Sequence, residues 1–248
     1  MNLILLIDSD FTTPTRVRLS DRRFNHIQDI LKAQFGQSLT VGKLNGLMGQ
    51  GEVVFKNNEA IELEVKLHNK PPEALPLTLI LALPRPPMLK RILFSAAMLG
   101  VKKIIILNFN RVEKSLWNSS SLKPDAIEEQ LILGLEQSKD TVMPEVILKK
   151  GFKSFVEDEL PNFIKGKQAL VAHPGGNRGQ LPIFFKNREL TPISPPISQS
   201  IVLIIGPEGG IIDYEIELLK SAGCQLIDLG PRILRTDSVL PFVVAKLF

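Results

Sequence analysis

The sequence has little cysteine, few aromatic residues and no long hydrophobic run. Its single cysteine, Cys224, excludes an internal disulfide and is typical of a reducing compartment, so we expect a cytoplasmic protein. No stretch of about 18 consecutive apolar residues occurs, and we therefore expect no membrane-spanning helix. The apolar start, residues 1–10, lacks a basic segment and a cleavage site, which indicates a first strand and not a signal peptide.

Several motifs that define common catalytic sites are also missing. The three histidines, His26, His68 and His173, are scattered and no Cys-x-x-Cys pair exists, so we expect no metal site. Neither a P-loop nor a GxGxxG dinucleotide motif occurs. A GxSxG motif is absent as well, which argues against a serine hydrolase.

Positive charge is modest in total but concentrated in two stretches. The formal net charge of +4 permits an RNA partner without requiring one. Residues 11–50 contain six lysines and arginines against two acidic residues, and residues 84–103 contain five against none. Such patches usually form a solvated surface, but two of them in one chain favour contacts with phosphate groups.

Two parts of the chain carry different hydrophobic patterns. Residues 1–70 have short alternating segments and many glycines, which predicts a small β-barrel. A proline-rich linker at 69–76 follows, and residues 76–248 alternate apolar strands with amphipathic helices, as in an α/β domain with a parallel sheet. In the first part we expect strands at 2–7, 16–19, 38–43, 49–55 and 60–67, and a helix at 26–35. In the second part we expect strands at 77–83, 102–108, 168–172, 201–205 and 224–229, helices at 88–99, 125–137, 155–164, 211–222 and 238–248, a stiff loop at 84–87 and an irregular connection at 177–200.

Three of the expected strands lead directly into glycine-containing loops. The strands end at Ala172, Ile205 and Leu229. Open α/β sheets bind ligands at the carboxyl ends of their strands, and glycine lets a ligand lie against bare backbone. Each loop alone could be a tight turn. A binding site is favoured because two such loops follow neighbouring strands and the second carries Arg232 and Arg235.

The loop sequences also resemble a known family. IIGPEGG at 204–210 and LGPRILRTDS at 229–238 look like the paired signature of the 16S rRNA (uracil-N3)-methyltransferases, which belong to the SPOUT class. Further similarity lies in RVEKS at 111–115, LEQSKDTVMPEV at 135–146 and HIQDILKAQFGQSLTVGKLNG at 26–46. The resemblance implies a PUA-like RNA-binding barrel at 1–70 and a SPOUT methyltransferase domain with a C-terminal trefoil knot at 76–248. It also implies S-adenosylmethionine as cofactor, a homodimer, and a uridine of 16S rRNA in the assembled small ribosomal subunit as substrate.

By this resemblance, the three loops form three walls around the cofactor. The cofactor-binding residues implied are Ala172, His173, Pro174, Gly206, Pro207, Glu208, Gly209, Gly210, Leu229, Gly230, Ile233, Leu234, Arg235 and Thr236. Leu229, Ile233 and Leu234 are apolar side chains of the type that enclose an adenine. Glu208 has an equally good alternative role, accepting hydrogen bonds from the amino end of the helix expected at 211–222. His173 is expected to be a wall or turn residue and not a catalytic base.

Methylation of uracil at N3 requires removal of an imide proton and stabilisation of the resulting anion. Arg232 and Arg235 are the predicted stabilisers of this charge, and Asp237 is the nearest carboxylate that could accept the proton. For Asp237 we favour a second role, capping the helix at 238–248, because Pro241 should be confined to a first turn. The predicted RNA contacts are Arg18, Arg22, Arg23, Lys32, Arg85 and Arg232.

Some positions depart from the family pattern, and two other functions stay open. Asp237, Ser238 and Val239 stand where Glu, Thr and Ala are common, and Lys139–Asp140 stands where an arginine often follows EQS. One alternative is a SPOUT enzyme that modifies another RNA position or a ribose 2′-hydroxyl. The other is a non-catalytic RNA-binding or ribosome-assembly protein that retains the fold.

Overall fold

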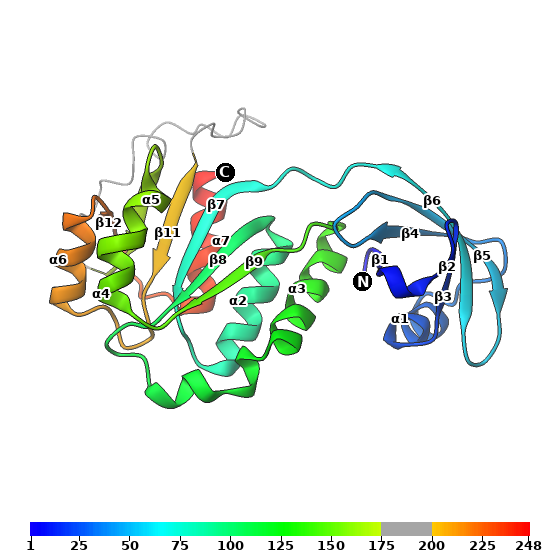
Figure 1. The fold of residues 1–248 in the computed structure, drawn as a ribbon, viewed down its shortest axis with the longest axis horizontal. Helices are drawn as coiled ribbons and strands as arrows, with labels where there is room; N and C mark the ends of the chain where they lie inside the picture. The colour runs from blue at the N-terminus through cyan, green and yellow to red at the C-terminus, as the bar shows by residue number, and fades with distance from the viewer. Residues whose placement is uncertain (175–199) are drawn as a thin grey trace. The chain divides into compact units, whose positions relative to one another are not determined.

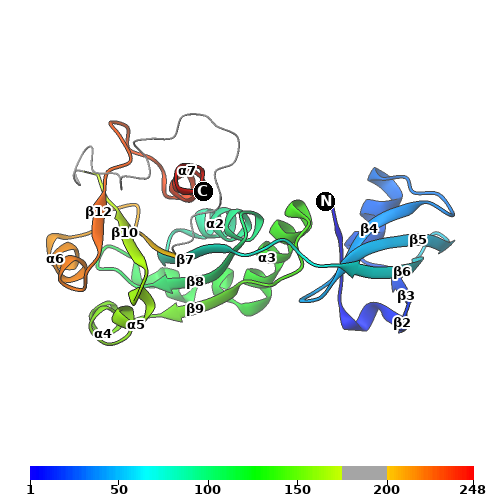
Figure 2. The same ribbon diagram turned by 90° about the horizontal axis from the view of Figure 1, so that it is seen from above.

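The computed structural model describes residues 1–174 and 200–248 of the chain, which divides into two compact units (Figures 1 and 2). One unit combines Met1–Glu73 with Leu131–Met143, and the other combines Ala74–Gln130 with Pro144–Phe248. Gly175 and Gly176, the glycines of the loop expected after Ala172, lie outside the described residues, as does the predicted connection up to residue 199. The first boundary falls inside the predicted linker, whereas the return of 131–143 to the first unit was not predicted.

The first unit is built on a six-stranded sheet with the strand order β1-β4-β5-β6-β3-β2. All its recorded pairings are antiparallel except that of β1 with β4. Its strands are β1 (Ile4–Leu6), β2 (Phe11–Thr13), β3 (Arg16–Leu19), β4 (Ser38–Lys43), β5 (Met48–Lys56) and β6 (Ile61–Asn69). The sheet is curled, but β1 and β2 are its two edges in the described pairings, so closure into a barrel is not observed.

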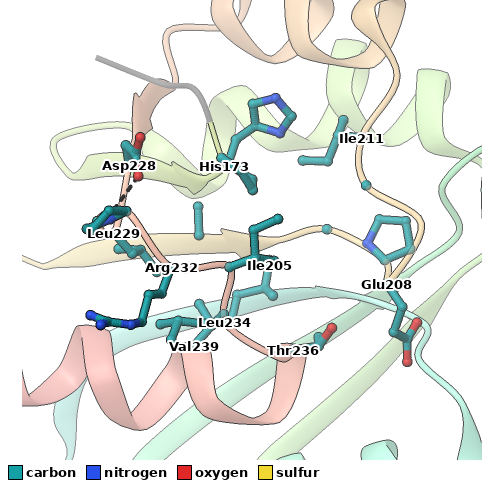
Figure 3. A pocket seen from close by; sticks show the side chains of 18 residues that line it. His173, Ile205, Glu208, Ile211, Asp228, Leu229, Arg232, Leu234, Thr236 and Val239 are labelled. Carbon is teal, nitrogen blue, oxygen red and sulfur yellow. Dashed lines mark hydrogen bonds between the residues drawn. The ribbon is translucent and has the colours of Figure 1, made fainter. Parts of the chain in front are cut away.

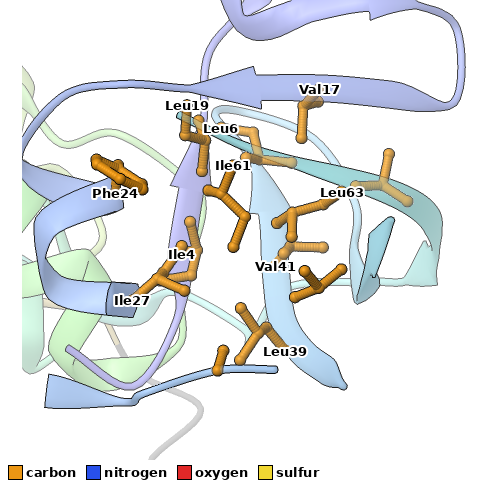
Figure 4. Close-up of a cluster of buried hydrophobic side chains, with 13 residues drawn as sticks. Ile4, Leu6, Val17, Leu19, Phe24, Ile27, Leu39, Val41, Ile61 and Leu63 are labelled. Atoms are coloured by element: carbon orange, nitrogen blue, oxygen red, sulfur yellow. The ribbon is translucent and has the colours of Figure 1, made fainter. Parts of the chain in front are cut away.

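Alternation of side chains along these strands produces the core of the first unit. In β3, Val17 and Leu19 are buried while Arg16 and Arg18 are exposed, as expected for a strand with one face against the core. Ile61 and Leu63 of β6 face the same cluster (Figure 4). The helix predicted at 26–35 is shorter and begins earlier, as α1 (Arg22–Asn25) followed by a π-helical turn at His26–Ile30.

The returning segment is held to the first unit by specific contacts. It includes the carboxyl half of α3 (Pro124–Ser138), where the backbone oxygen of Glu136 accepts hydrogen bonds from the N–H groups of Asn2 and Leu3 at 3.0 Å each. The Thr141 hydroxyl donates to the Gly46 carbonyl at 2.6 Å. A Cβ on Gly42 would lie 2.5 Å from the Thr141 methyl group, so glycine is required for this close approach.

The second unit contains a six-stranded sheet with the order β12-β10-β11-β7-β8-β9, and every recorded pair in it is parallel. The strands are β7 (Leu75–Ala82), β8 (Val101–Leu107), β9 (Glu145–Lys149), β10 (Gln168–Ala172), β11 (Ile201–Ile205) and β12 (Gln225–Ile227). All five residues of β11 are buried, which fits its unbroken apolar sequence. The predicted α/β class with a parallel sheet is confirmed, although β9 was missed.

Helices cover both faces of this sheet. Figure 2 shows α2 (Pro86–Met98) and α7 (Thr236–Leu247) on one face, with α4 (Phe152–Ser154) and α5 (Leu160–Ile164) on the other. A π-helical turn at Phe155–Glu159 joins α4 to α5. Helix α6 (Asp213–Ser221) lies beside β12.

The prediction of a stiff non-helical loop at 84–87 is wrong, because α2 begins at Pro86 after the N-cap residue Arg85. Proline is tolerated there because N–H groups of a first helical turn have no partner within the helix. Cys224 is buried, and burial raises the pKa of its thiol to about 11, so the thiol is protonated near neutral pH and contributes to packing.

Candidate functional site

Three neighbouring parallel strands bring their carboxyl ends to one edge of the second sheet. Strands β12, β10 and β11 are adjacent, and the loops after them line a cavity of about 340 Å³ (Figure 3). The lining residues are Ala172, His173, Pro174, Ile205, Gly206, Pro207, Glu208, Gly210, Ile211, Asp228, Leu229, Gly230, Pro231, Arg232, Ile233, Leu234, Thr236 and Val239. The described parts of the three loops therefore converge on one cavity.

Most residues predicted to bind a cofactor lie on this cavity wall, and the exceptions are Gly209 and Arg235. The sequence did not single out five further lining residues, Ile205, Ile211, Asp228, Pro231 and Val239. All five lie within or next to the two motifs, so motif position could have found them. Val239 lies in α7 and reaches the cavity because that helix starts directly after the last loop.

The loop after β11 turns tightly beneath the cavity. The N–H of Gly210 donates to the Pro207 carbonyl at 2.8 Å, and Gly210 has a positive φ of 81°. A Cβ on Gly206 would lie 2.5 Å from Cγ1 of Ile211, which also lines the cavity. Glycine at 206 therefore lets Ile211 pack against the backbone and leaves main-chain groups close to the cavity.

Glu208 does not contact the amino end of α6, in contrast to its alternative role. Its carboxylate accepts a hydrogen bond from the backbone N–H of Arg85 at 3.2 Å. Glu215 occupies the amino end of α6 instead: it is 2% exposed and accepts from the N–H groups of Asn110 at 2.6 Å and Ile212 at 3.3 Å. Ile212 is the N-cap of α6, and Asp213 is its first helical residue.

The loop after β12 is fixed by a carboxylate and a glycine. Asp228 accepts a hydrogen bond from the N–H of Gly230 at 2.9 Å, and Gly230 has a φ of 121°, a conformation that favours glycine. Leu229 and Leu234 line the cavity, as does Ile233, whose exposed fraction is 85%. This loop thus presents apolar side chains at a concave, solvent-accessible surface.

His173 is positioned by its backbone, whose N–H donates to the Ile227 carbonyl at 3.0 Å. Burial lowers the pKa of His173 and outweighs the neighbouring carboxylates of Asp213 and Asp228, which act in the opposite direction. The imidazole is therefore neutral near pH 7, which fits a wall of the cavity.

The two predicted catalytic arginines lie in different surroundings. Arg232 lines the cavity, whereas Arg235 is the N-cap residue of α7 and contacts the Met88 sulfur at 3.3 Å. Asp237 lies within the first turn of α7, so its predicted role as the cap is wrong. Its carboxylate pairs with Arg91 at 3.2 Å and lies 3.5 Å from Nε of Arg235. Pro241 is the sixth residue of the helix, beyond the first turn that we expected for it.

Comparison with known proteins identifies the fold that carries this cavity. The model of a family described as an RNA methyltransferase domain matches residues 71–247. The chain belongs to this family.

Relatives of this RNA methyltransferase cover nearly its whole length. The ribosomal RNA small subunit methyltransferase E of Treponema pallidum is 26% identical over 242 residues, which is 96% of this chain and 87% of the relative. A methyltransferase structure from Legionella pneumophila with bound cofactor SAM aligns with a TM-score of 0.71 at 23% identity, covering 99% of this chain and 96% of the other. Ribosomal RNA small subunit methyltransferase E of Neisseria gonorrhoeae, bound to S-adenosyl methionine, aligns with a TM-score of 0.69 at 22% identity, covering 99% and 96%.

The basic side chains that were predicted to contact RNA differ in their exposure to solvent in this RNA methyltransferase. Arg18 and Arg22 pair with Glu62 and Glu136, respectively, but keep nearly half of their side-chain surface exposed. Lys32 is exposed. Arg85 is 69% exposed at its side chain and pairs with Glu113.

Arg23 is the exception, because it is buried and cannot reach a phosphate. Its exposed fraction is 6%, and its guanidinium hydrogen-bonds both oxygens of Asp10 at 2.6 and 2.7 Å as well as the carboxylate of Asp21. The prediction that Arg23 binds RNA is therefore wrong. No cluster of three or more metal-ligating side chains occurs among the described residues, and within them no helix is long and apolar enough to cross a membrane.

Proposed function

We propose that this chain is an S-adenosylmethionine-dependent methyltransferase that modifies N3 of a uridine in the RNA of the small ribosomal subunit. The observation that carries the proposal is the cavity at the carboxyl edge of the parallel sheet, formed by the two loops that bear the family motifs. The relatives' names support a small-subunit RNA substrate. Choice of uracil N3 rests on the resemblance of GPEGG and LGPRILR to the uracil-N3 methyltransferases.

The residues present fit this cofactor. A cavity of about 340 Å³ lies in the size range of small-molecule sites, and its wall combines apolar side chains with exposed backbone of glycine loops. Gly206 supplies backbone that a Cβ would obstruct. The residues that would hold the cofactor are those of the three walls, at 172–174, 206–210 and 229–236. When bound, the cofactor supplies a sulfonium methyl group as the electrophile.

In this proposal, side chains at the edge of the cavity accept the N3 proton of the uracil and stabilise the negative charge that remains. Arg232, on the cavity wall, and Arg235, at the start of α7, stabilise negative charge on the uracil oxygens or a flanking phosphate. Two carboxylates are candidates for accepting the N3 proton. Asp237 is the one that sequence spacing indicates. Glu208 lines the cavity, as does Asp228, whose carboxylate already accepts the Gly230 N–H.

The first unit contributes RNA binding in this proposal. We assign it a PUA-like role, with Arg18, Arg22 and Lys32 as phosphate contacts, while Arg85 adds a cation in the second unit. A ribosomal substrate also implies a cytoplasmic location.

The trefoil knot belongs to the proposal as well. Stretching a single molecule from its two ends tests it, because a knotted chain reaches a shorter contour length than an unknotted chain of the same number of residues.

A homodimer completes the proposal. Helix α7 is apolar and leaves Phe242 36% exposed. Ile233, in the loop just before this helix, is 85% exposed. These side chains provide apolar surface for a second copy of the chain. Sedimentation at micromolar concentration should give twice the monomer mass. A monomer mass across that range would contradict this part of the proposal.

The deciding experiment is transfer of a labelled methyl group to small ribosomal subunits that lack native modification, followed by nucleoside analysis. We expect label in 3-methyluridine. Label in another nucleoside or in a 2′-O-methyl group would retain the enzyme class but change the target. Absence of both cofactor binding and label would favour a non-catalytic ribosome-assembly protein.

A further inference from the structure

A second cavity lies on the other side of the first turn of α7. Thr236 and Val239 of this helix line the cofactor cavity, whereas Asp237, Ser238 and Pro241 line a groove of about 500 Å³. The remaining wall comes mainly from α2. Its lining residues are Lys90, Arg91, Phe94, Ser95, Gln130, Asp237, Ser238 and Pro241. The two cavities therefore share one helical turn but present different chemistry.

The groove is lined by more cationic than anionic side chains, and the one carboxylate that lines it forms an ion pair. Lys90 and Arg91 contribute positive charge, and Asp237 is the carboxylate on this wall. Oδ2 of Asp237 lies 3.2 Å from the Arg91 guanidinium, and the Asp237 side chain is only 14% exposed while that of Arg91 is 60% exposed. Asp237 thus anchors Arg91 from the buried side and leaves much of the guanidinium open to solvent.

Several polar groups of this groove have no partner in the described part of the chain. The Lys90 ammonium forms no ion pair there, and the hydroxyls of Ser95 and Ser238 form no side-chain hydrogen bond. Together with the exposed face of the Arg91 guanidinium, these three groups form a set of hydrogen-bond donors whose charged members are all positive. Such a set binds a tetrahedral oxyanion better than a neutral ligand, since charge-assisted hydrogen bonds are the strong ones.

We propose that this groove binds a backbone phosphodiester of the RNA substrate, next to the nucleotide that enters the cofactor cavity. Lys90 and Arg91 contact the phosphate oxygens, Ser95 and Ser238 donate to them, and Asp237 is a positioning residue that orients Arg91. The inference rests on the proposed function, because it uses RNA as the substrate. It adds a subsite that the cofactor cavity does not contain.

The test uses the full-length enzyme with unmodified small ribosomal subunits and compares Lys90→Gln with the matched control Lys153→Gln. Lys90 and Lys153 are exposed helical lysines of the same unit, and Lys153 lies on α4 outside the groove. We expect Lys90→Gln to weaken subunit binding roughly tenfold and to reduce the slope of log affinity against log salt by about 1. Affinity for S-adenosylmethionine should stay unchanged, and Lys153→Gln should behave as wild type.

The outcomes separate this inference from the proposed function. If Lys90→Gln binds the subunit with the affinity and salt slope of wild type while wild type methylates it, the phosphate subsite is refuted and the enzyme assignment stands. If wild type neither binds the subunit nor transfers methyl groups, the proposed function itself fails. If Lys90→Gln instead changes the dissociation constant of a homodimer and leaves RNA affinity unchanged, the groove is a protein interface and the phosphate subsite is wrong.

Discussion

At the scale of single residues, the two carboxylates proposed as proton acceptors have different environments. Glu208 lines the cofactor cavity and accepts one backbone hydrogen bond, whereas Asp237 faces the neighbouring groove and is paired with Arg91. A general base must lie within hydrogen-bond reach of the proton that it removes. On this geometry Glu208 is the better candidate for proton removal, and Asp237 is better placed to orient arginines.

Replacement of each carboxylate by its amide separates these roles. We expect Glu208→Gln to lower kcat by about 10²- to 10⁴-fold and to remove the acidic limb of the pH–rate profile, because it deletes a general base. Asp237→Asn should chiefly raise KM for the RNA, and Asp237→Glu should restore it. Loss of the acidic limb in Asp237→Asn, with a normal profile in Glu208→Gln, would instead assign the proton to Asp237.

Two glycines of one loop provide a matched pair for testing the cofactor cavity. A Cβ on Gly206 would lie 2.5 Å from Ile211, whereas a Cβ on Gly209 would lie 3.4 Å from Arg111, which is ordinary contact. Gly206→Ala should push Ile211 into the cavity, destabilise the protein by about 1–3 kcal/mol and weaken cofactor binding. Gly209→Ala should change both quantities much less. Calorimetric titration with the cofactor measures the difference, and equal effects would contradict the packing argument.

The buried arginine of the first unit predicts a pH dependence of stability. Burial alone would raise the pKa of Asp21, but hydrogen bonds and charge from Arg23, together with the charge of Arg22, outweigh it and lower this pKa. A lowered carboxyl pKa stabilises the folded state above the unfolded value of about 3.9, and this stability is lost as pH falls through the folded pKa.

Asp21→Asn should therefore destabilise the first unit near neutral pH, because asparagine can still cap α1 but loses the charge that pairs with Arg23, and the deficit relative to wild type should shrink below about pH 4. Urea unfolding at several pH values measures it. The exposed Asp29→Asn serves as control. A deficit that stays constant down to pH 2 would show that the Asp21 titration makes no contribution.

At the scale of elements, sequence reasoning succeeded where local pattern and tertiary role agree. The bounds of β10 and β11 are as predicted, because a strand that is buried on both faces is apolar there: all five residues of β11 and the central three of β10 are buried. The start of α2 was missed because Pro86 and Pro87 look like helix breakers unless the first turn is known to begin there. The role of Arg23 was missed because its carboxylate partners in space, Asp10 and Asp21, give no periodic signal in the sequence.

The start of α6 depends on one buried carboxylate that no sequence pattern revealed. Glu215 accepts hydrogen bonds from Asn110 and Ile212, and so ties the loop after β8 to the helix. Glu215→Ala should destabilise the second unit by about 3 kcal/mol, because it removes a buried, charged acceptor from two backbone N–H groups. Glu217→Gln on the same helix removes a mostly exposed pair with Lys220 and should cost less than about 1 kcal/mol. Denaturant midpoints compare the two, and equal effects would refute the buried role.

At the scale of the whole molecule, the discontinuous first unit could not be predicted from composition. The linker at 69–76 marks a real change of pattern, but the later return of Leu131–Met143 follows from contacts between residues far apart in sequence. The carboxylate of Glu136 is 1% exposed and receives two hydrogen bonds from Arg22 at 2.9 and 3.0 Å. Contacts of this kind are visible only when the fold is known.

A fragment of residues 1–73 should consequently fail to fold cooperatively. It lacks the carbonyl that pairs with the N–H groups of Asn2 and Leu3 beside the edge strand β1, and it lacks Thr141, which bonds Gly46 and packs on Gly42. Joining residues 131–143 to this fragment through a flexible linker of about 15 residues should restore a cooperative urea transition, since such a linker spans about 20 Å. A sharp transition in the 1–73 fragment alone would show that the strands suffice and that the returning segment is only an attachment to a complete unit.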